Sequence, residues 1–195
     1  KKINLDEIFI STDSKKIINL INKIGINDYY LRPKKYSGNN SQITDVILYG
    51  INWLLKNKKK SFDAVMLLQP TTPFRDVKET NRIIKLFKDN KLESLATVSK
   101  VSAHPQHIFQ VKKNGKWSHL LNKRVRSLNK QDLSTNFYCE NGHIYLCKTN
   151  FLKKFKQLIV KKKTYLFKQK MSTLDIDYLQ DFKICEFRVK NKLFN

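Results

Sequence analysis

Apolar residues recur along the chain at two spacings, one typical of strands and one typical of helices. Residues 7–11 form a short apolar run, and residues 14–24 then carry apolar side chains at helical spacing up to Gly25. A second helical segment at 41–55 precedes a run at 64–68 that is apolar at every position. Later strands are expected at 94–101, 108–111, 144–147 and 165–167, and a last helix at 178–189. Strand and helix therefore alternate through the first half.

This alternation predicts an open, doubly wound α/β sheet of Rossmann-like type, with mostly parallel strands. The run at 64–68 is typical of a strand covered on both faces, so we expect it near the centre of the sheet. Asp76 and Glu79 have the spacing of a capping box and predict a helix that ends near Asn90. A length of 195 residues suits a single domain, 1–195, with a full core.

A net charge of +23 on its face favours a polyanion partner. Only six of the 39 basic residues are arginine, however, and arginine is the residue that recognises phosphate with a bidentate fork. The lysines are spread over almost every segment, as expected when an AT-biased genome fills solvated positions. No zinc-finger, RNA-recognition or leucine-zipper pattern occurs, so we do not expect nucleic acid as a partner, and a basic nucleic-acid-binding module remains the alternative.

The apolar runs are far shorter than the roughly 20 residues of a membrane span, and the N-terminus does not have the pattern of a secretory signal. We therefore expect a cytoplasmic protein with no membrane partner. Cys139, Cys147 and Cys185 form no Cys-x-x-Cys pair, which favours reduced thiols that mostly serve packing. The four histidines show no ligand spacing, so a zinc site is not expected.

The first segment that could carry chemistry runs from Leu67 to Arg75, where an apolar strand leads into a polar loop. Ligands of open α/β sheets bind in the crevice beyond the carboxyl ends of the strands. Gln69 offers donors and acceptors there, and Arg75 offers a fixed cation. The alternative is that the prolines and threonines of this loop only shape the turn and the start of the next helix.

The second segment contains Asp175 and Asp177, which point the same way if the backbone between them is extended. Magnesium favours one or two carboxylates together with substrate phosphates and water, so this pair would suit a magnesium ion beside a nucleotide. The alternative is that Asp177 caps the last helix, with Gln180 at the capping-box position.

The third segment leads from Lys130 to Asn141-Gly142, directly before an apolar strand. A tight hairpin turn is the structural alternative for Asn-Gly. The chain has no Gly-x-Ser-x-Gly elbow and no glycine-rich loop of the dinucleotide or Walker type, which excludes the serine-hydrolase and P-loop classes.

Together these segments resemble one family, the N-acylneuraminate cytidylyltransferases and their relatives for other nine-carbon acidic sugars. The matching stretches, in the family's order and approximate spacing, are Ser11-Thr12-Asp13-Ser14, Leu31-Arg32-Pro33, Asp45-Val46-Ile47-Leu48, Leu67 to Pro73, His104-Pro105, Asn141-Gly142 and Asp175-Ile176-Asp177. The resemblance covers nearly the whole chain. The segment from Leu67 to Pro73 favours a sialic or legionaminic type of acid over the eight-carbon sugar acid.

The resemblance implies an enzyme that transfers CMP from CTP to the anomeric hydroxyl of the sugar acid and releases pyrophosphate, with Mg²⁺ as cofactor. It also implies a homodimer built partly from the region of Lys130. The implied residue roles are metal binding by Asp175 and Asp177, sugar-acid contacts by Gln69 and Asn141, and nucleotide contacts by Arg32 and Ser41.

Two departures from the family pattern stand out. Lys130 stands where many relatives have arginine, which keeps the charge for the sugar carboxylate but loses the bidentate geometry. The family's opening strand, phosphate-binding loop and helix are not in this sequence. We therefore expect the chain to be incomplete at its N-terminus and, by itself, not to make CMP-sugar. An inactive remnant is the alternative reading of such a chain.

Overall fold

The computed structural model describes residues 3–26, 28–121, 136–170 and 174–193. The chain divides into two compact units. The first unit consists of Lys1–Leu67, Arg75–Ala96 and Tyr145–Tyr165, and the second unit of Leu68–Phe74, Thr97–Ile144 and Leu166–Asn195. We describe each unit by itself, and the assignment of one domain to 1–195 stays a prediction.

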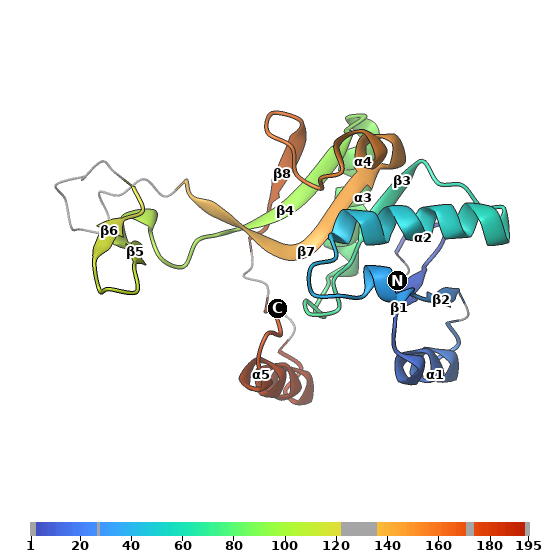
Figure 1. Ribbon diagram of the computed structural model, residues 1–195, viewed down its shortest axis with the longest axis horizontal. Coiled ribbons are helices and arrows are strands. Elements are labelled where there is room, and N and C mark those ends of the chain that lie inside the picture. The colour runs from blue at the N-terminus through green and yellow to red at the C-terminus, as the bar shows by residue number, and fades with distance from the viewer. Residues whose placement is uncertain (1–2, 27, 122–135, 171–173, 194–195) are drawn as a thin grey trace. The chain divides into compact units, whose positions relative to one another are not determined.

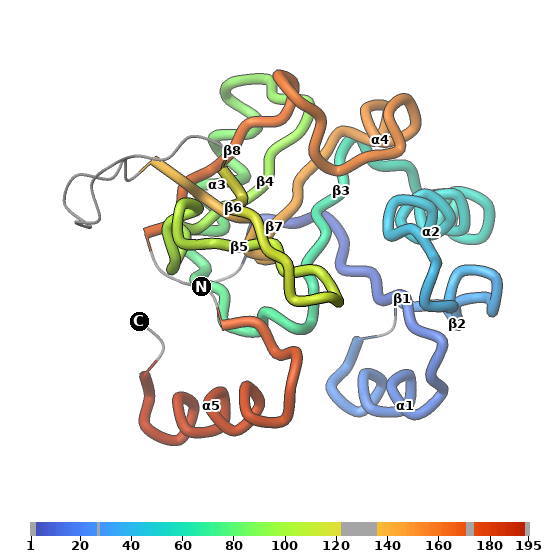
Figure 2. The backbone as a smooth tube through the Cα atoms, turned by 60° about the vertical axis from the view of Figure 1, so that its left-hand side comes forward, coloured from blue at the N-terminus to red at the C-terminus, as the bar shows by residue number. Residues whose placement is uncertain are grey.

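The first unit opens with two short parallel strands joined by a helix. Strand β1 (Ile10–Thr12) pairs with β2 (Tyr29–Leu31), and α1 (Lys15–Lys23) connects them (Figures 1 and 2). Helix α1 begins at Ser14, whose side chain accepts a hydrogen bond from the Ile17 amide. Strand β1 and helix α1 overlap the apolar run at 7–11 and the helical spacing at 14–24.

An aromatic cluster holds these strands against α2 (Ile43–Lys58). The Phe9, Tyr30 and Trp53 rings pack against one another, with ring centroids 5.2 to 5.7 Å apart. Gly50 of α2 faces this cluster: a Cβ there would lie 3.5 Å from the Phe9 ring, an ordinary van der Waals distance. The short helix η1 (Lys34–Tyr36) lies in the loop between β2 and α2. Stacked rings thus fix the N-terminal strands within the first unit.

Four strands from separate parts of the chain form one sheet. Its order is β3 (Ala64–Leu67), β7 (Tyr138–Lys148), β4 (Ser94–Lys100), β8 (Thr164–Lys168). Strands β3 and β7 are antiparallel, with Val65 opposite Cys147, so the sheet is mixed (Figure 1). The predicted α/β class is confirmed by this architecture and by the solved structure reported below.

The position of β3 differs from the prediction. All four residues of β3 are apolar, yet each is only half buried, and the strand stands at one end of the described sheet. The prediction of a central strand relied on the apolar run alone. Among the described residues β3 pairs on one side only, with β7, so apolar composition did not indicate the strand's place in the order.

Helices α3 (Val77–Asp89) and α4 (Thr149–Phe155) complete the first unit. The Asp76 carboxylate accepts a hydrogen bond from the Glu79 amide, as the capping spacing predicted. Ile83, Leu95 and Leu152 are fully buried. None of the helices in the described part of the chain combines the length and apolarity that crossing a membrane demands.

Lysine occupies the left-handed backbone position after several helices. Lys59 ends α2 with φ +54°, and Lys156 ends α4 with φ +49°. Lys91, Lys162 and Lys192 also have positive φ. Glycine is the usual residue at such positions because a Cβ is strained there by about 1–2 kcal/mol.

The second unit contains a small hairpin and the last helix. Strands β5 (Phe109–Val111) and β6 (Trp117–His119) are antiparallel, and the short helix η2 (Pro105–His107) precedes them. Helix α5 (Leu179–Lys190) begins at Tyr178, where the Asp181 carboxylate accepts from the Tyr178 amide. The alternative reading, in which Asp177 caps this helix with Gln180, is therefore wrong by one residue.

The three cysteines differ in exposure, which predicts one fast-reacting thiol. Cys139 is exposed, whereas Cys147 and Cys185 are buried, and burial raises the pKa of both of these thiols. We expect Cys139 to react with an aromatic disulfide reagent at least about tenfold faster than the other two near neutral pH. Cys139→Ser should remove the fast phase. Three equal rates would contradict the burial described here.

Candidate functional site

The loop that follows β3, residues 68–74, lies against strand β7 within the second unit. Its turn is closed by the Thr72 amide, which donates to the Gln69 carbonyl at 3.2 Å. Thr72 is 1% exposed, and its hydroxyl lies 3.3 Å from the Gly142 carbonyl. The loop is thus docked on β7 and carries the half-buried Gln69.

Asn141 and Gly142 lie inside β7 and do not form the hairpin turn that their sequence suggested. Gly142 has φ +64°, a left-handed conformation in which a side chain is strained. A Cβ on Gly142 would also lie 2.7 Å from Gln69 Oε1. The glycine therefore gives the backbone its unusual conformation and leaves room for Gln69, which is why the pair occurs within a strand.

The Asn141 side chain is fully engaged in a polar network. Its Nδ2 donates to Ser99 Oγ at 2.8 Å and to Gln169 Oε1 at 2.6 Å. Its Oδ1 accepts from Thr97 Oγ1 at 2.7 Å and from the His143 amide at 3.2 Å. All the hydrogen-bonding positions of the amide are thus used inside the protein.

His143 is a buried residue of the site that the sequence argument missed. It is 3% exposed, and its Nε2 lies 2.9 Å from the Phe74 carbonyl oxygen. Its Nδ1 lies 2.8 Å from Nε2 of the buried Gln169. The available signal was a polar side chain at the start of the apolar stretch 144–147 of β7.

The segment with the two aspartates is hydrogen-bonded to the same loop. The Ile176 amide donates to the Thr71 carbonyl at 2.8 Å. Asp175 and Asp177 are exposed, whereas Ile176 between them is half buried. This alternation is that of an extended backbone with both carboxylates on one side. Among the described residues no three His, Cys, Asp or Glu side chains group as a metal site.

Arg32 and Ser41 lie in the first unit, on the loop between β2 and α2. Arg32 Nη2 lies 3.5 Å from Asp13 Oδ1, and its Nε donates to Ser37 Oγ at 3.3 Å. Ser41 Oγ accepts from the Gly38 amide at 3.1 Å. Both residues therefore belong to one hydrogen-bonded loop that follows the parallel strands.

Lys130 and Arg75 are the two remaining residues that the sequence analysis named. Lys130 lies outside the described residues, so its role stays a prediction. Arg75 is half buried at the start of α3, and burial lowers the pKa of its guanidinium below the ordinary value. An arginine remains charged near neutral pH even so.

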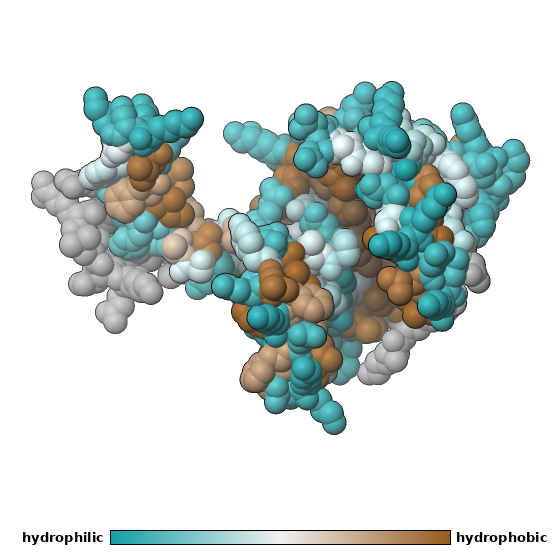
Figure 3. Space-filling view, turned by 60° about the horizontal axis from the view of Figure 1, so that its bottom comes forward, coloured by the Kyte–Doolittle hydropathy of each residue, from teal (hydrophilic) through white to brown (hydrophobic). Residues whose placement is uncertain are grey.

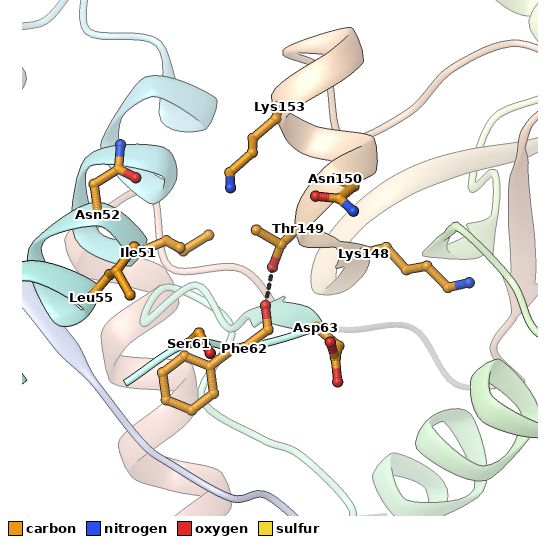
Figure 4. A pocket seen from close by; sticks show the side chains of 10 residues that line it. All are labelled: Ile51, Asn52, Leu55, Ser61, Phe62, Asp63, Lys148, Thr149, Asn150 and Lys153. Carbon is orange, nitrogen blue, oxygen red and sulfur yellow. Dashed lines mark hydrogen bonds between the residues drawn. The ribbon is translucent and has the colours of Figure 1, made fainter. Parts of the chain in front are cut away.

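A cavity of about 350 Å³ opens in the first unit, and none of its lining residues is a predicted site residue (Figure 4). Ile51, Leu55 and Phe62 give it apolar walls, and Lys148 and Lys153 contribute ammonium groups. The Thr149 hydroxyl beside it donates to the Phe62 carbonyl at 2.6 Å. Lysine is common over the whole chain, so this lining does not indicate a particular ligand.

Comparison with solved structures identifies the fold of this chain. A solved structure of CMP:2-keto-3-deoxy-manno-octonic acid synthetase complexed with CTP matches 98% of this chain and 84% of that chain, with a TM-score of 0.63 and 13% identity. At this identity the match shows the fold alone, a Rossmann-like α/β fold that this chain shares with that synthetase. No model of a protein family matches the chain.

Curated relatives narrow the class further. The CMP-N,N'-diacetyllegionaminic acid synthase of Legionella pneumophila is 29% identical over 191 residues, which span 93% of this chain and 77% of the relative. A pseudaminic acid cytidylyltransferase and UDP-2,4-diacetamido-2,4,6-trideoxy-beta-L-altropyranose hydrolase of Helicobacter pylori is 23% identical over 95% of this chain and 35% of the relative. A third relative, the post-translational flagellin modification protein B of Campylobacter coli, is 23% identical over 95% of this chain and 77% of the relative. By name, the first two relatives are a CMP-sugar-acid synthase and a sugar-acid cytidylyltransferase, at modest identity over most of this chain.

Proposed function

We propose that this protein catalyses the transfer of CMP from CTP to the anomeric hydroxyl of a nine-carbon acidic sugar of the legionaminate or N-acylneuraminate type, with release of pyrophosphate. The observation that carries the proposal is the hydrogen bond from the Ile176 amide to the Thr71 carbonyl. It joins the Asp-Ile-Asp segment to the loop that carries Gln69. Metal-binding and sugar-binding residues would then share one site.

Gln69 is the residue that we assign to the sugar acid. Its side chain is half buried above Gly142, and an amide can donate to a carboxylate and accept from a hydroxyl. Asn141, whose amide is engaged inside the protein, would support this site from below by fixing β7. Lys130 would add a charge for the sugar carboxylate.

Arg32 and Ser41 are assigned to the nucleotide. The Arg32 guanidinium is held by Ser37 and Asp13, which fixes its direction before a ligand arrives. A preorganised cation loses less conformational freedom on binding an anionic ligand than a free side chain does. CTP is a cytoplasmic nucleotide, and we therefore also propose the cytoplasm as the place of action.

Asp175 and Asp177 fit Mg²⁺ by their chemistry. They are two exposed carboxylates one residue apart on an extended backbone, and Mg²⁺ takes one or two carboxylates together with phosphate oxygens and water. The bound ion would neutralise charge on the triphosphate. The protein's own part is to hold both carboxylates beside the loop, because positioning supplies much of the catalysis in such a transfer.

The test is pyrophosphate release from CTP, with Mg²⁺ and one of three acids: N-acetylneuraminate, a diacetyllegionaminate or the eight-carbon keto-deoxy acid. Because the chain by itself is not expected to make CMP-sugar, the chain as given is compared with one extended by a relative's N-terminal phosphate-binding segment, and the kinetic variants are made in the extended protein. In the extended protein we expect release with a nine-carbon acid and CTP, and none when ATP, GTP or UTP replaces CTP. Preference for the eight-carbon acid would overturn the assignment of the sugar, and release that needs no sugar acid would overturn the transfer.

We also propose that the protein is a homodimer that uses the hairpin of β5 and β6. The Phe109 and Trp117 rings make an edge contact at 5.2 Å, yet both side chains are largely exposed, as is Val111. In Figure 3 this hairpin shows a hydrophobic surface (at the left). Exposed apolar surface of this kind is typical of a protein interface.

We expect the protein to elute as a dimer in size-exclusion chromatography with light scattering, and Val111→Lys to shift it to the monomer. A buried lysine in the interface is unfavourable because its charge loses water. The matched control is Leu20→Lys, which changes a similarly exposed apolar residue on α1. A wild-type monomer, or equal dissociation by both variants, would contradict the assignment of this interface.

A further inference from the structure

Three segments of the second unit are joined through the His143 ring. The Phe74 carbonyl at the end of the loop contacts Nε2 at 2.9 Å, and Gln169 contacts Nδ1 at 2.8 Å. Gln169 is itself buried, and its backbone N–H donates to the Val98 carbonyl at 2.9 Å. The ring thus connects the loop after β3 to the residue that follows β8.

The hydrogen bonds that run from Asn141 through Gln169 and His143 to Phe74 have their directions set from both ends. Asn141 Nδ2 donates to Gln169 Oε1, so the other end of the Gln169 amide, Nε2, faces the imidazole and donates to Nδ1. The Phe74 carbonyl can only accept, so Nε2 of His143 must carry a proton. Both ends require the same form of the ring, the neutral imidazole protonated at Nε2.

The loop that carries Gln69 is consequently held at two points by consecutive residues of β7. The Thr72 hydroxyl is shared between the Gly142 carbonyl at 3.3 Å and the Gln69 carbonyl at 3.2 Å, and His143 donates to Phe74 at the end of the loop. Gln69 lies before both points in the sequence. Release of the Phe74 contact would allow the loop, and Gln69 with it, to move away from β7.

We propose that His143 is a positioning residue for the sugar-acid site: as the Nε2-protonated neutral ring, fixed by Gln169, it clamps the loop that carries Gln69. This inference rests on the proposed function for the role of Gln69. His143 itself contacts no substrate, since it is buried beneath the loop. Gln169 acts by presenting a donor to Nδ1, which keeps the ring's only proton on the side of Phe74.

Two substitutions separate the two contacts of the ring. In His143→Gln the side-chain amide can donate to the Phe74 carbonyl, which preserves the clamp. In His143→Asn the shorter amide occupies the place of Nδ1 and can accept from Gln169, but it does not reach Phe74. His143→Phe keeps the ring shape and removes both contacts. A residue that only fills space would tolerate Phe best, whereas a clamp is preserved best by Gln.

The kinetic test compares KM for the sugar acid with KM for CTP. We expect His143→Asn and His143→Phe to raise KM for the sugar acid by about tenfold, as loss of one buried hydrogen bond allows, while KM for CTP stays within about twofold. His143→Gln should restore most of the affinity. Ile83→Val, in the core of the first unit, is the control that lowers stability without moving either KM.

A second readout is independent of activity. The Thr72 and Ile176 amides both donate within or onto the loop, so their hydrogen exchange reports whether the loop is docked. We expect faster exchange of both amides in His143→Phe and near wild-type exchange in His143→Gln. Nitrogen chemical shifts of the wild-type imidazole should show a protonated Nε2 and an unprotonated Nδ1.

The outcomes separate this inference from the proposed function. Absence of turnover in the extended protein would refute the proposed function, and the exchange and imidazole measurements would still decide whether His143 clamps the loop. A ring protonated at Nδ1, or equal exchange in the Gln and Phe variants, would overturn the inference. The inference would also be overturned if KM for the sugar acid rose in Ile83→Val as much as in the His143 variants of equal stability. Poorly folded variants leave the wild-type imidazole shifts as the deciding measurement.

Discussion

Asp177→Asn is expected to lower kcat for CMP transfer roughly a thousandfold, because the neutral amide removes one of the two charges that would hold Mg²⁺ on the triphosphate. The change is local. Asp177 contributes its backbone amide, and not its carboxylate, to the hydrogen bond with Asp181 at the start of α5. Asp175→Asn should have a similar effect, measured as pyrophosphate release across a range of magnesium concentrations.

The matched control for these variants is Glu186→Gln on α5, which removes an exposed carboxylate from the same unit. It should leave kcat and the magnesium dependence unchanged. Full turnover by the Asp175→Asn, Asp177→Asn double variant would show that the metal is held elsewhere. If excess magnesium fully restores activity, the aspartates contribute to metal affinity and not to the rate of the chemical step.

Gly142→Ala is expected to raise KM for the sugar acid by about tenfold and to lower the free energy of unfolding by about 1 kcal/mol. The stability loss follows from φ +64°, which strains any residue with a Cβ. The loss of affinity follows from the contact at 2.7 Å, which would push Gln69 Oε1 from its place. Denaturant unfolding and steady-state kinetics measure the two effects separately.

Gly115→Ala separates strain from displacement. Gly115 has φ +77°, but a Cβ there would meet nothing within 4 Å. The two variants should therefore lose similar stability, and only Gly142→Ala should lose affinity for the sugar acid. Equal kinetics in both variants would contradict the assignment of Gln69 to the substrate.

Local signals in the sequence predicted helices α1, α2, α3 and α5, but not α4. Ser14 and Asp76 were read as helix starts, and both accept a hydrogen bond from the first turn of the helix that follows. A cap and the helix it begins are close in sequence, so their interaction is encoded within a few residues. The last helix shifted by only one residue, because Tyr178 and Asp181 together form its start.

Pairing between distant segments was not predictable in the same way. The apolar run 64–67 reads as central, but its place in the sheet depends on β7, which lies about 80 residues later and inserts beside it in antiparallel orientation. The sequence Asn141-Gly142 is typical of a tight turn, which needs a positive φ. In this protein the positive φ of Gly142 instead occurs within a strand that passes close to Gln69.

The same distinction between local and distant interactions applies to the candidate site. The aspartates and Gln69 were found because motif spacing indicates them, and their roles stay predictions. His143 was missed because its meaning depends on Phe74 and Gln169, which come from separate segments. No spacing within the sequence records such a network, since each of its members is an ordinary polar residue when taken alone.

The five lysines with positive φ have a consequence for the evolution of the gene. Each occupies a backbone conformation that asparagine tolerates better than lysine. Lysine and asparagine codons differ only in their third base, so a single substitution at any of these sites would relieve strain without a loss of AT content. Selection for heat tolerance would thus have five independent one-step routes, none of which touches a residue assigned to catalysis.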